Sequence, residues 1–473
     1  MSNEGEVIDN RPQPDNFVEF MPWACSQLQM DHVIIIEKIE QHEYVSAVNP
    51  DRIKKVRSKA KLQSHFELTS DQEKDENLDT LKTPISIDSQ MVYITAVYDH
   101  ADNLTQLKFE KNKEIPRLIW KILGLIIKYY TQLTSITING GMNQYTIHEI
   151  SKFLKTSYVT EVILDNSFIC EANFCLLLNC ENSLYHISLA GCDIDDNITA
   201  NIASKLVFPL PASKKLSILN LSSNKITDEG AKHLGEALRS NRQLSYLNLS
   251  NNKLSDDGAD YLLNSLSEFV LTADELLTAR ARHIAFLKRK NELAKKTLQE
   301  LKAGEFGRGA RKKTLRQTTV GLTPKRGKLE KDTSLKSLVD ANAKSFLNVD
   351  VLLYDKAVAI AENELGDFDD PFSSDNTVFK DGYTYSKGNN SLCYLNLSFN
   401  NLSYLCLKKI ATLIKYQRSL DRKPSGLYNV IIEGNPLPVS CTELNQIDDL
   451  IDMGLAAHRR ISGVKKRGGH TKR

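Results

Sequence analysis

The sequence has no long uninterrupted hydrophobic run and no excess of charge of one sign. Its most apolar stretch, LIWKILGLIIKYY at residues 118–130, is broken by Lys121 and Lys128. It is also shorter than the roughly 20 residues that a membrane-spanning helix needs, so we interpret it as a buried helix. The 61 basic and 59 acidic residues nearly cancel. No global charge therefore draws the chain to nucleic acid or to a membrane, and we expect neither as a partner.

The sequence also lacks the short motifs that carry common catalytic and metal chemistry. It contains no G-x-x-x-x-G-K-[ST] phosphate loop, no H-E-x-x-H, no G-x-S-x-G and no C-x-x-C pair. We therefore expect no catalytic residue, no cofactor, no metal and no small-molecule substrate.

Cysteine is present at only eight positions, and the first residues, MSNEGEVIDN, show no basic segment followed by an apolar run. We expect a cytosolic, reduced compartment from this combination. Cys170, Cys175 and Cys180 recur every five residues. On a helix, steps of five turn a side chain by about 140°, so the three thiols do not share a face, and we expect buried apolar cysteines there.

Three stretches share one frame, L-x-x-L-x-L-x-x-N-x-L. They are LSILNLSSNKI at 216–226, LSYLNLSNNKL at 244–254 and LCYLNLSFNNL at 392–402. An apolar triplet with steps of three and four follows each stretch, as in Ala231, Leu234 and Leu238. Such steps are typical of a helix. Each unit is therefore predicted to be a strand, a turn and a helix, which is the pattern of a leucine-rich repeat.

Weaker copies of the frame extend the array on both sides. They open at residues 104, 133, 159, 184 and 427, which makes eight predicted units. Successive openings from 104 to 244 stand 25 to 32 residues apart. Long strand–helix units of this kind resemble leucine-rich repeats of the ribonuclease-inhibitor type. We therefore expect an α/β solenoid in the form of a horseshoe arc, in which the leucines of adjacent units form one continuous core.

Asparagine recurs where each predicted strand bends into its turn. A buried amide can bond the backbone groups that a turn leaves unpaired, so we expect a structural role for these residues. Gly230 and Gly258 follow between turn and helix, with Asp228, Asp256 or Asp257 available to cap the helices. The structural asparagines are Asn224, Asn252, Asn400 and Asn435.

Strand residues that alternate with the leucines are expected to face the concave side of the arc. These residues are neutral and small or polar, with two tyrosines of the kind that anchor protein interfaces. We therefore expect another protein as the partner of this face. The predicted contact residues are His186, Ile218, Asn220, Tyr246, Asn248, Tyr394 and Asn396.

Leu244 and Leu392 open consecutive units although they stand 148 residues apart, so about 120 residues are inserted near 271–390. The insert begins with a predicted capping box, Thr272 with Glu275. A basic amphipathic helix follows, whose apolar positions include Ile284, Leu287 and Ala294, with Asn291 among them. This helix has two and a half heptads, and packing on a partner or on the solenoid is as consistent with it as a coiled coil.

The rest of the insert is divided into blocks of opposite charge. Residues 280–336 carry a net charge of +13 and residues 350–381 a net charge of −7. After the helix, from Gly304 onward, both blocks are expected to be disordered. The basic block is either a solvated tether or an electrostatic anchor for an acidic polymer such as a tubulin surface. The anchor residues would be Arg308, Arg311, Lys312, Lys313, Arg316, Lys325 and Arg326.

The order of these parts resembles the family of leucine-rich-repeat-containing protein seventy-one, which is linked to motile cilia. The resemblance runs from about residue 100 to 440, through SLSEFVLTADELLTARARHIAFLKRK at 265–290, the basic insert and GLYNVIIEGNPL at 426–437. It implies a non-catalytic scaffold of the ciliary axoneme with axonemal or microtubule-associated partners. It carries over no functional residues.

Five segments are expected. They are an N-terminal extension at 1–90, repeats at 91–270, the insert at 271–390, resumed repeats at 391–440 and a C-terminal helix with a basic tail at 441–473. One alternative to the scaffold is a regulatory adaptor of the GTPase-activating or ubiquitin-ligase type, although no recruiting motif is visible. The other is a nuclear protein recruited by its basic arm, since the C-terminal HRRISGVKKRGGHTKR resembles a nuclear localisation signal.

Overall fold

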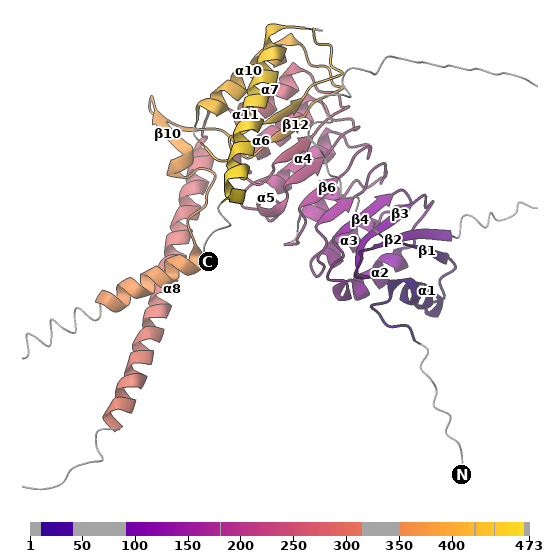
Figure 1. Cartoon of the computed structure of the whole chain (residues 1–473), viewed down its shortest axis with the longest axis horizontal. Helices are drawn as coiled ribbons and strands as arrows, with labels where there is room; N and C mark the ends of the chain where they lie inside the picture. Colours follow the sequence, from indigo (N-terminus) through magenta and orange to yellow (C-terminus); the bar gives the residue numbers. More distant parts are fainter. Residues whose placement is uncertain are drawn as a thin grey trace, which may run out of the picture. The chain divides into compact units, whose positions relative to one another are not determined.

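The structure is a computed structural model of the chain, and it describes residues 11–40, 91–179, 181–314, 351–420, 422–438 and 440–467. The chain divides into two compact units (Figure 1). The repeat unit comprises Met1–Ser267 and Gly388–Arg473, and the insert unit comprises Glu268–Lys387.

Ten strands form one sheet in the described part of the repeat unit. All neighbours pair in parallel except β2 and β3, which are antiparallel. In spatial order the strands are β1 (Val33–Glu40), β2 (Met91–Tyr98), β3 (Leu104–Glu110), β4 (Ser135–Asn139), β5 (Glu161–Ile163), β6 (His186–Ser188), β7 (Ile218–Asn220), β8 (Tyr246–Asn248), β12 (Tyr394–Asn396) and β13 (Asn429–Ile431).

The eight strands from β3 to β13 are the strands of the eight predicted repeats, so this part of the prediction is confirmed. β12 pairs directly with β8, with Leu395 opposite Leu247. The repeats before and after the insert therefore form one sheet. A parallel strand needs a crossover connection, and between successive repeats a helix or short helical turn provides it.

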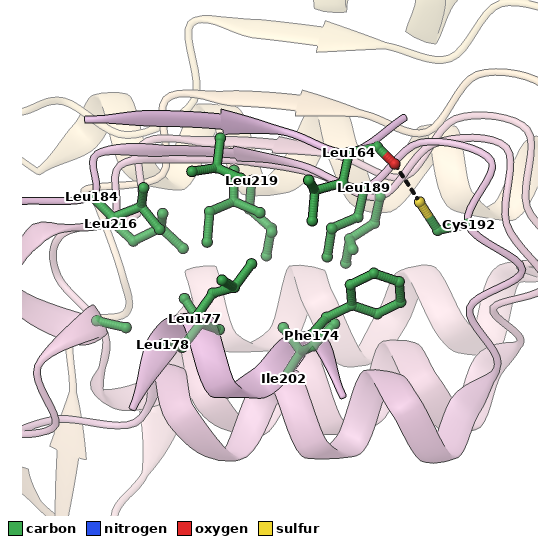
Figure 2. Close-up of a cluster of buried hydrophobic side chains, with 14 of the residues drawn as sticks. Leu164, Phe174, Leu177, Leu178, Leu184, Leu189, Cys192, Ile202, Leu216 and Leu219 are labelled. Atoms are coloured by element: carbon green, nitrogen blue, oxygen red, sulfur yellow. Dashed lines mark hydrogen bonds between the residues drawn. The ribbon is translucent and has the colours of Figure 1, made fainter. Parts of the chain in front are cut away.

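Helices connect the strands and pack on one face of the sheet. Figure 2 shows leucines of the strands meeting side chains of these connections, with Leu219 and Leu189 above Phe174 and Ile202. The connections are α2 (Arg117–Ile126) with η3 (Ile127–Tyr129), α3 (Thr146–Leu154), η4 (Phe174–Leu178), α4 (Asp196–Leu206), α5 (Ala212–Lys215), α6 (Asp228–Ser240), α7 (Asp256–Leu266) and α10 (Tyr404–Ser419), and α11 (Thr442–Arg467) follows β13.

The leucines of the repeat frame are fully buried. The strand period of two directs the second and third leucine of each set toward the helices, and the first is buried where the chain enters the strand. Leu216, Leu219 and Leu221 form such a set in one repeat, and Leu392, Leu395 and Leu397 form the equivalent set after the insert. The apolar stretch at 118–130 forms α2 and η3, and Trp120 and Leu123 within it are buried. Its interpretation as a buried helix is confirmed.

The sheet begins two strands before the predicted first repeat. Helix α1 (Phe17–Gln27) buries Phe17 and Met21, and β1 then pairs in parallel with β2. Residues 11–40, predicted to belong to an N-terminal extension, thus add buried side chains of α1 to the core and an edge strand, β1, to the sheet. These residues contain no copy of the leucine-rich frame, so the repeat pattern does not predict their place beside the first repeat.

The insert unit is built around α8 (Ala273–Thr314), a single long helix in Figure 1. Thr272 and Glu275 form the expected capping box: Thr272 N donates to Glu275 Oε2 over 2.8 Å, and Glu275 N donates to Thr272 Oγ1 over 3.2 Å. The chain returns as a helix at 351–365. A three-stranded antiparallel sheet completes the unit, with the strands in the order β10 (Thr377–Lys380), β11 (Tyr383–Ser386) and β9 (Phe269–Val270). A short 3-10 helix, η5 (Ser374–Asn376), precedes β10.

The prediction of disorder for the acidic block is wrong for residues 351–381. Asp370 is buried and accepts from Arg282 Nε over 2.6 Å and from Arg282 Nη2 over 3.1 Å. Lys290 Nζ lies 2.6 Å from Glu362 Oε1, and Phe368 contacts the rings of His283 and Phe286. Basic residues of α8 thus pair with the acidic segment. A net charge counted for each block separately does not predict that the two blocks order each other.

Helix α8 also continues past Gly304, where the sequence reading expected order to end, as far as Thr314. Once a helix is nucleated, each further residue adds a backbone hydrogen bond, and this offsets the intrinsic cost of glycine. The rest of the basic block, from 315 to 350, lies outside the described residues.

Candidate functional site

The open face of the sheet, opposite the helices, carries the side chains predicted for the concave surface. Strand register aligns them in two rows that run across the repeats. The first row contains Glu161, His186, Ile218, Tyr246, Tyr394 and Asn429, and the second contains Ile163, Ser188, Asn220, Asn248, Asn396 and Ile431. The structure thus brings all seven predicted contact residues onto one continuous face.

Tyr246 and Tyr394 form the aromatic centre of this face. Their rings stack with centroids 4.0 Å apart and an interplanar angle of 6°. Burial and a hydrogen bond to Tyr246 raise the pKa of the Tyr394 hydroxyl above its ordinary value. The Tyr394 hydroxyl is therefore neutral at physiological pH. The pair joins β8 to β12, the two strands that the insert separates in the sequence.

The part of the face around β5 and β6 is more polar, and Glu161, His186 and Asp165 there already have partners. His186 Nδ1 lies 2.6 Å from Glu161 Oε1. Asp165 Oδ1 accepts from Ser188 Oγ over 2.6 Å and from Ala190 N over 2.9 Å. Asn220 Nδ2 donates to Ser188 Oγ over 2.9 Å, which extends the network to β7.

Three asparagines of the second row are held in the same way. The Oδ1 atoms of Asn220, Asn248 and Asn396 accept from the backbone N–H two residues further on, over 3.1, 3.1 and 3.0 Å. This local bond fixes each amide in one orientation before any partner binds. A surface that is ordered in advance loses less side-chain entropy on association.

The predicted structural asparagines lie at the ends of the strands and bridge adjacent repeats. Asn224 is the most buried of them: its Oδ1 accepts from Cys192 N and Ile194 N, both over 3.0 Å. Its Nδ2 donates to Leu189 O over 2.9 Å and to Leu221 O over 3.0 Å. Asn252, Asn400 and Asn435 make equivalent bonds to their own repeat and to the preceding one.

Two members of this ladder have other residue types. Ser167 is buried, with Oγ donating to Ile138 O over 3.2 Å and accepting from Gly140 N over 3.1 Å. Cys192 donates through Sγ to Leu164 O over 3.1 Å (Figure 2). Both residues stand at the ninth position of the repeat frame, where most of the other repeats have asparagine. A frame that allowed any small hydrogen-bond donor at this position would include them.

Aspartates at the helix starts bridge repeats as well, in a way that the sequence reading missed. Asp228 was expected to cap its own helix. Its Oδ1 instead accepts from Ser255 N over 2.7 Å and from Gly258 N over 3.0 Å, at the start of the next helix. A Cβ on Gly258 would lie 2.3 Å from that Oδ1, so the close approach requires glycine. Asp256 accepts in the same way from Ser403 N over 2.8 Å, across the insert.

The predicted cysteine cluster does not form a buried set. Cys170 is exposed, Cys175 is half-buried, and Cys180 lies outside the described residues. The prediction of burial is wrong for Cys170 because the segment is a turn followed by η4, whose Phe174, Leu177 and Leu178 occupy the core instead.

The predicted electrostatic anchor is only partly within the described residues. Arg308, Arg311, Lys312 and Lys313 lie on the C-terminal part of α8. Arg316, Lys325 and Arg326 lie outside the described residues.

Other kinds of site find little support in the described part of the chain. No group of three His, Cys, Asp or Glu residues is arranged to hold a metal ion there. None of the helices searched there is both long and apolar enough to cross a membrane. A cavity of about 440 Å³ lies apart from the open face of repeats β4 to β13, lined by Asp15, Asn16, Val18, Glu19, Lys38, Tyr98 and Asp102.

Comparison with known proteins supports the repeat assignment. A family model described as a leucine-rich repeat matches residues 212–235 and 240–263. Among solved structures, an internalin from Listeria monocytogenes is similar at 14% identity over 77% of this chain and 75% of that chain, with a TM-score of 0.28. So low a TM-score adds nothing to the assignment. The comparison with curated proteins found no match. The two repeat matches and the parallel strand pairing show that the chain contains leucine-rich repeats in a solenoid-like fold.

Proposed function

We propose that the protein is a non-catalytic scaffold or adaptor, and that the open face between β7 and β13 binds another protein. The main support is the stacked pair Tyr246 and Tyr394, with centroids 4.0 Å apart, beside a row of asparagines held in one orientation. Aromatic anchors with polar neighbours are the residues that carry most of the energy of protein interfaces. Repeats of this kind present such extended surfaces to protein partners.

We further propose that the partner belongs to the ciliary axoneme, and that the repeats form an arc of the ribonuclease-inhibitor type. The support for both is the resemblance of the repeat–insert–repeat order to the family linked to motile cilia. A basic arm that includes Arg308, Arg311, Lys312 and Lys313 would add electrostatic attachment to an acidic polymer. Two weak attachments on one chain raise the effective concentration of each without a tight single site.

The test is localisation of the tagged full chain in a ciliated cell, with a variant of the open face. The wild-type protein should decorate the axoneme, and Tyr246→Asp with Tyr394→Asp should lose that position. The charges would disrupt an aromatic contact while the buried leucines beneath stay unchanged. Deletion of 305–336 removes Arg308, Arg311, Lys312 and Lys313 with the rest of the basic arm, and attachment should weaken in the same assay if the arm contributes to it.

Tyr261→Asp is the matched control, because Tyr261 is an exposed tyrosine of α7. It should localise as the wild type does. If the double variant localises as the wild type does, the open face is not the surface that binds the axonemal partner. A nuclear signal without any axonemal signal would instead favour the nuclear alternative.

A further inference from the structure

Helix α8 has one side that belongs to the insert unit. Arg282, Phe286 and Lys290 contact the returning segment there. At 100° per residue, these positions and the half-buried Leu293 and buried Thr297 fall within an arc of about 80°. His283, which stacks on Phe368, and the buried Ala294 lie just outside that arc, so the contacts with the insert unit extend a little further around the helix.

A second apolar stripe runs along α8 outside that arc. Leu277, Ile284 and Leu287 are 61%, 54% and 43% exposed, and they lie roughly 100° to 180° around the helix from the buried side. Their spacing of seven and three residues is that of a coiled-coil seam, with the exposed Asn291 next in the seam. Large exposed side chains that continue a single seam mark an interaction surface more strongly than scattered ones do.

The charges beside this stripe are of one sign. Arg280 lies within the seam, between Leu277 and Ile284, and Lys288 and Lys295 lie along one flank of it; all three are exposed. The carboxylates of α8 among the described side chains, such as Glu292, lie at least about 90° away from the centre of the stripe. A second copy of the same helix would place lysine against lysine, which is unfavourable at the flanking positions of a coiled coil.

We propose that this stripe is a docking site for an acidic amphipathic helix of a partner protein. Leucine-type side chains of the partner would pack on Leu277, Ile284 and Leu287, and its glutamates would pair with Arg280, Lys288 and Lys295. From Leu277 to Lys295 the stripe is about 27 Å long, which fits a partner helix of about 18 residues. This site is on the insert unit, so it is independent of the open face proposed above.

The test uses the full chain and two synthetic helices of three heptads. Both peptides carry leucine at the a and d positions, one with glutamate and the other with lysine at the e and g positions. Fluorescence anisotropy should show saturable binding of the glutamate peptide, weakened by salt because exposed charges contribute. The lysine peptide should not bind. Ile284→Asp with Leu287→Asp should weaken binding of the glutamate peptide by at least about tenfold.

Charge reversal provides a sharper outcome than loss of binding. Lys288→Glu with Lys295→Glu should shift preference from the glutamate to the lysine peptide. The matched control is Val351→Asp with Leu352→Asp, which alters two exposed apolar side chains on the other helix of the same unit and should leave binding unchanged. Circular dichroism of each variant establishes that it is folded.

Several results would overturn the proposal. These are equal binding of both peptides, retained binding by the Ile284/Leu287 variant, or self-association of the wild-type chain that this variant abolishes. Protection of an Ile284→Cys thiol from maleimide in the free protein would also overturn it, because the chain itself would then cover the stripe. The variant Tyr246→Asp with Tyr394→Asp should bind the glutamate peptide normally, so failure of the open-face proposal is distinguishable.

Discussion

Replacement of Asn400 by alanine should destabilise the repeats, because its amide bonds the backbone of a repeat that lies before the insert. One of its partners, Leu254 N, is 146 residues away in the sequence. Asn400 Oδ1 accepts from Leu254 N over 3.1 Å, and Nδ2 donates to Leu249 O over 3.0 Å, both in the repeat before the insert. Nδ2 also donates to Leu397 O over 3.1 Å within its own repeat. The amide therefore connects two repeats and closes its own turn.

The magnitude follows from those three bonds. A hydrogen bond contributes about 1 kcal/mol net, and an unpaired buried group costs about 1–3 kcal/mol. Asn400 is only half-buried, so water replaces some of the lost partners. We expect Asn400→Ala to lower the free energy of unfolding by about 2–3 kcal/mol. Urea unfolding monitored by circular dichroism measures this, and amide exchange at Leu254 should accelerate.

Asn401→Ala is the matched control. Asn401 is exposed, and its backbone N–H keeps its 2.8 Å bond to Leu254 O in the variant. A surface change of this kind is expected to alter stability by less than about 0.5 kcal/mol. If Asn400→Ala changed stability no more than Asn401→Ala does, the claim that this amide joins the two repeats would be refuted.

Four further results are expected. Gly258→Ala should destabilise the repeats by about 1–3 kcal/mol in thermal unfolding, because a Cβ there meets Asp228; no loss would contradict the aspartate bridge. Asp370→Ala should cost about 3 kcal/mol, measured as faster proteolysis of the insert unit, since it leaves Arg282 without its carboxylate; unchanged proteolysis would contradict the ion pair. Burial raises the pKa of Cys192 to about 12, so below that pH it should resist alkylation while exposed Cys170 reacts; equal labelling at pH 8 would contradict its burial. Deleting 268–387 with a short glycine–serine link should leave a single cooperative unfolding transition, because Gly388 lies against the Ser267 carbonyl; loss of the transition would contradict separable units.

The strands could be predicted because the leucine frame gives both the spacing of the buried side chains and the face of the sheet on which they lie. Leu219 and Leu221 are spaced so that an extended chain buries both, Leu216 is buried where the chain enters the strand, and the same frame at Leu392 identifies the continuation of the array after a long interruption. The open-face residues follow from the same alternation. Their placement required no information beyond the repeat.

Other features depend on pairings between distant residues, which a local pattern does not contain. β1 has no repeat frame and is recognisable only through its pairing with β2. The order of the acidic block depends on Arg282 meeting Asp370, 88 residues away. Asp228 bonds the following helix rather than its own, because the repeat stacks helix starts side by side.

A disulfide test addresses the central claim that β8 and β12 are neighbours in one sheet. Asn248 and Asn396 are opposite each other in the register, and adjacent strands lie about 4.8 Å apart, within the range that a disulfide spans. Asn248→Cys with Asn396→Cys should therefore form a disulfide rapidly under mild oxidation, identified by mass spectrometry of proteolytic peptides. Asn220→Cys with Asn396→Cys, two strands apart at about 9.6 Å, should not. Rapid bonding of the second pair, or none of the first, would contradict a continuous array.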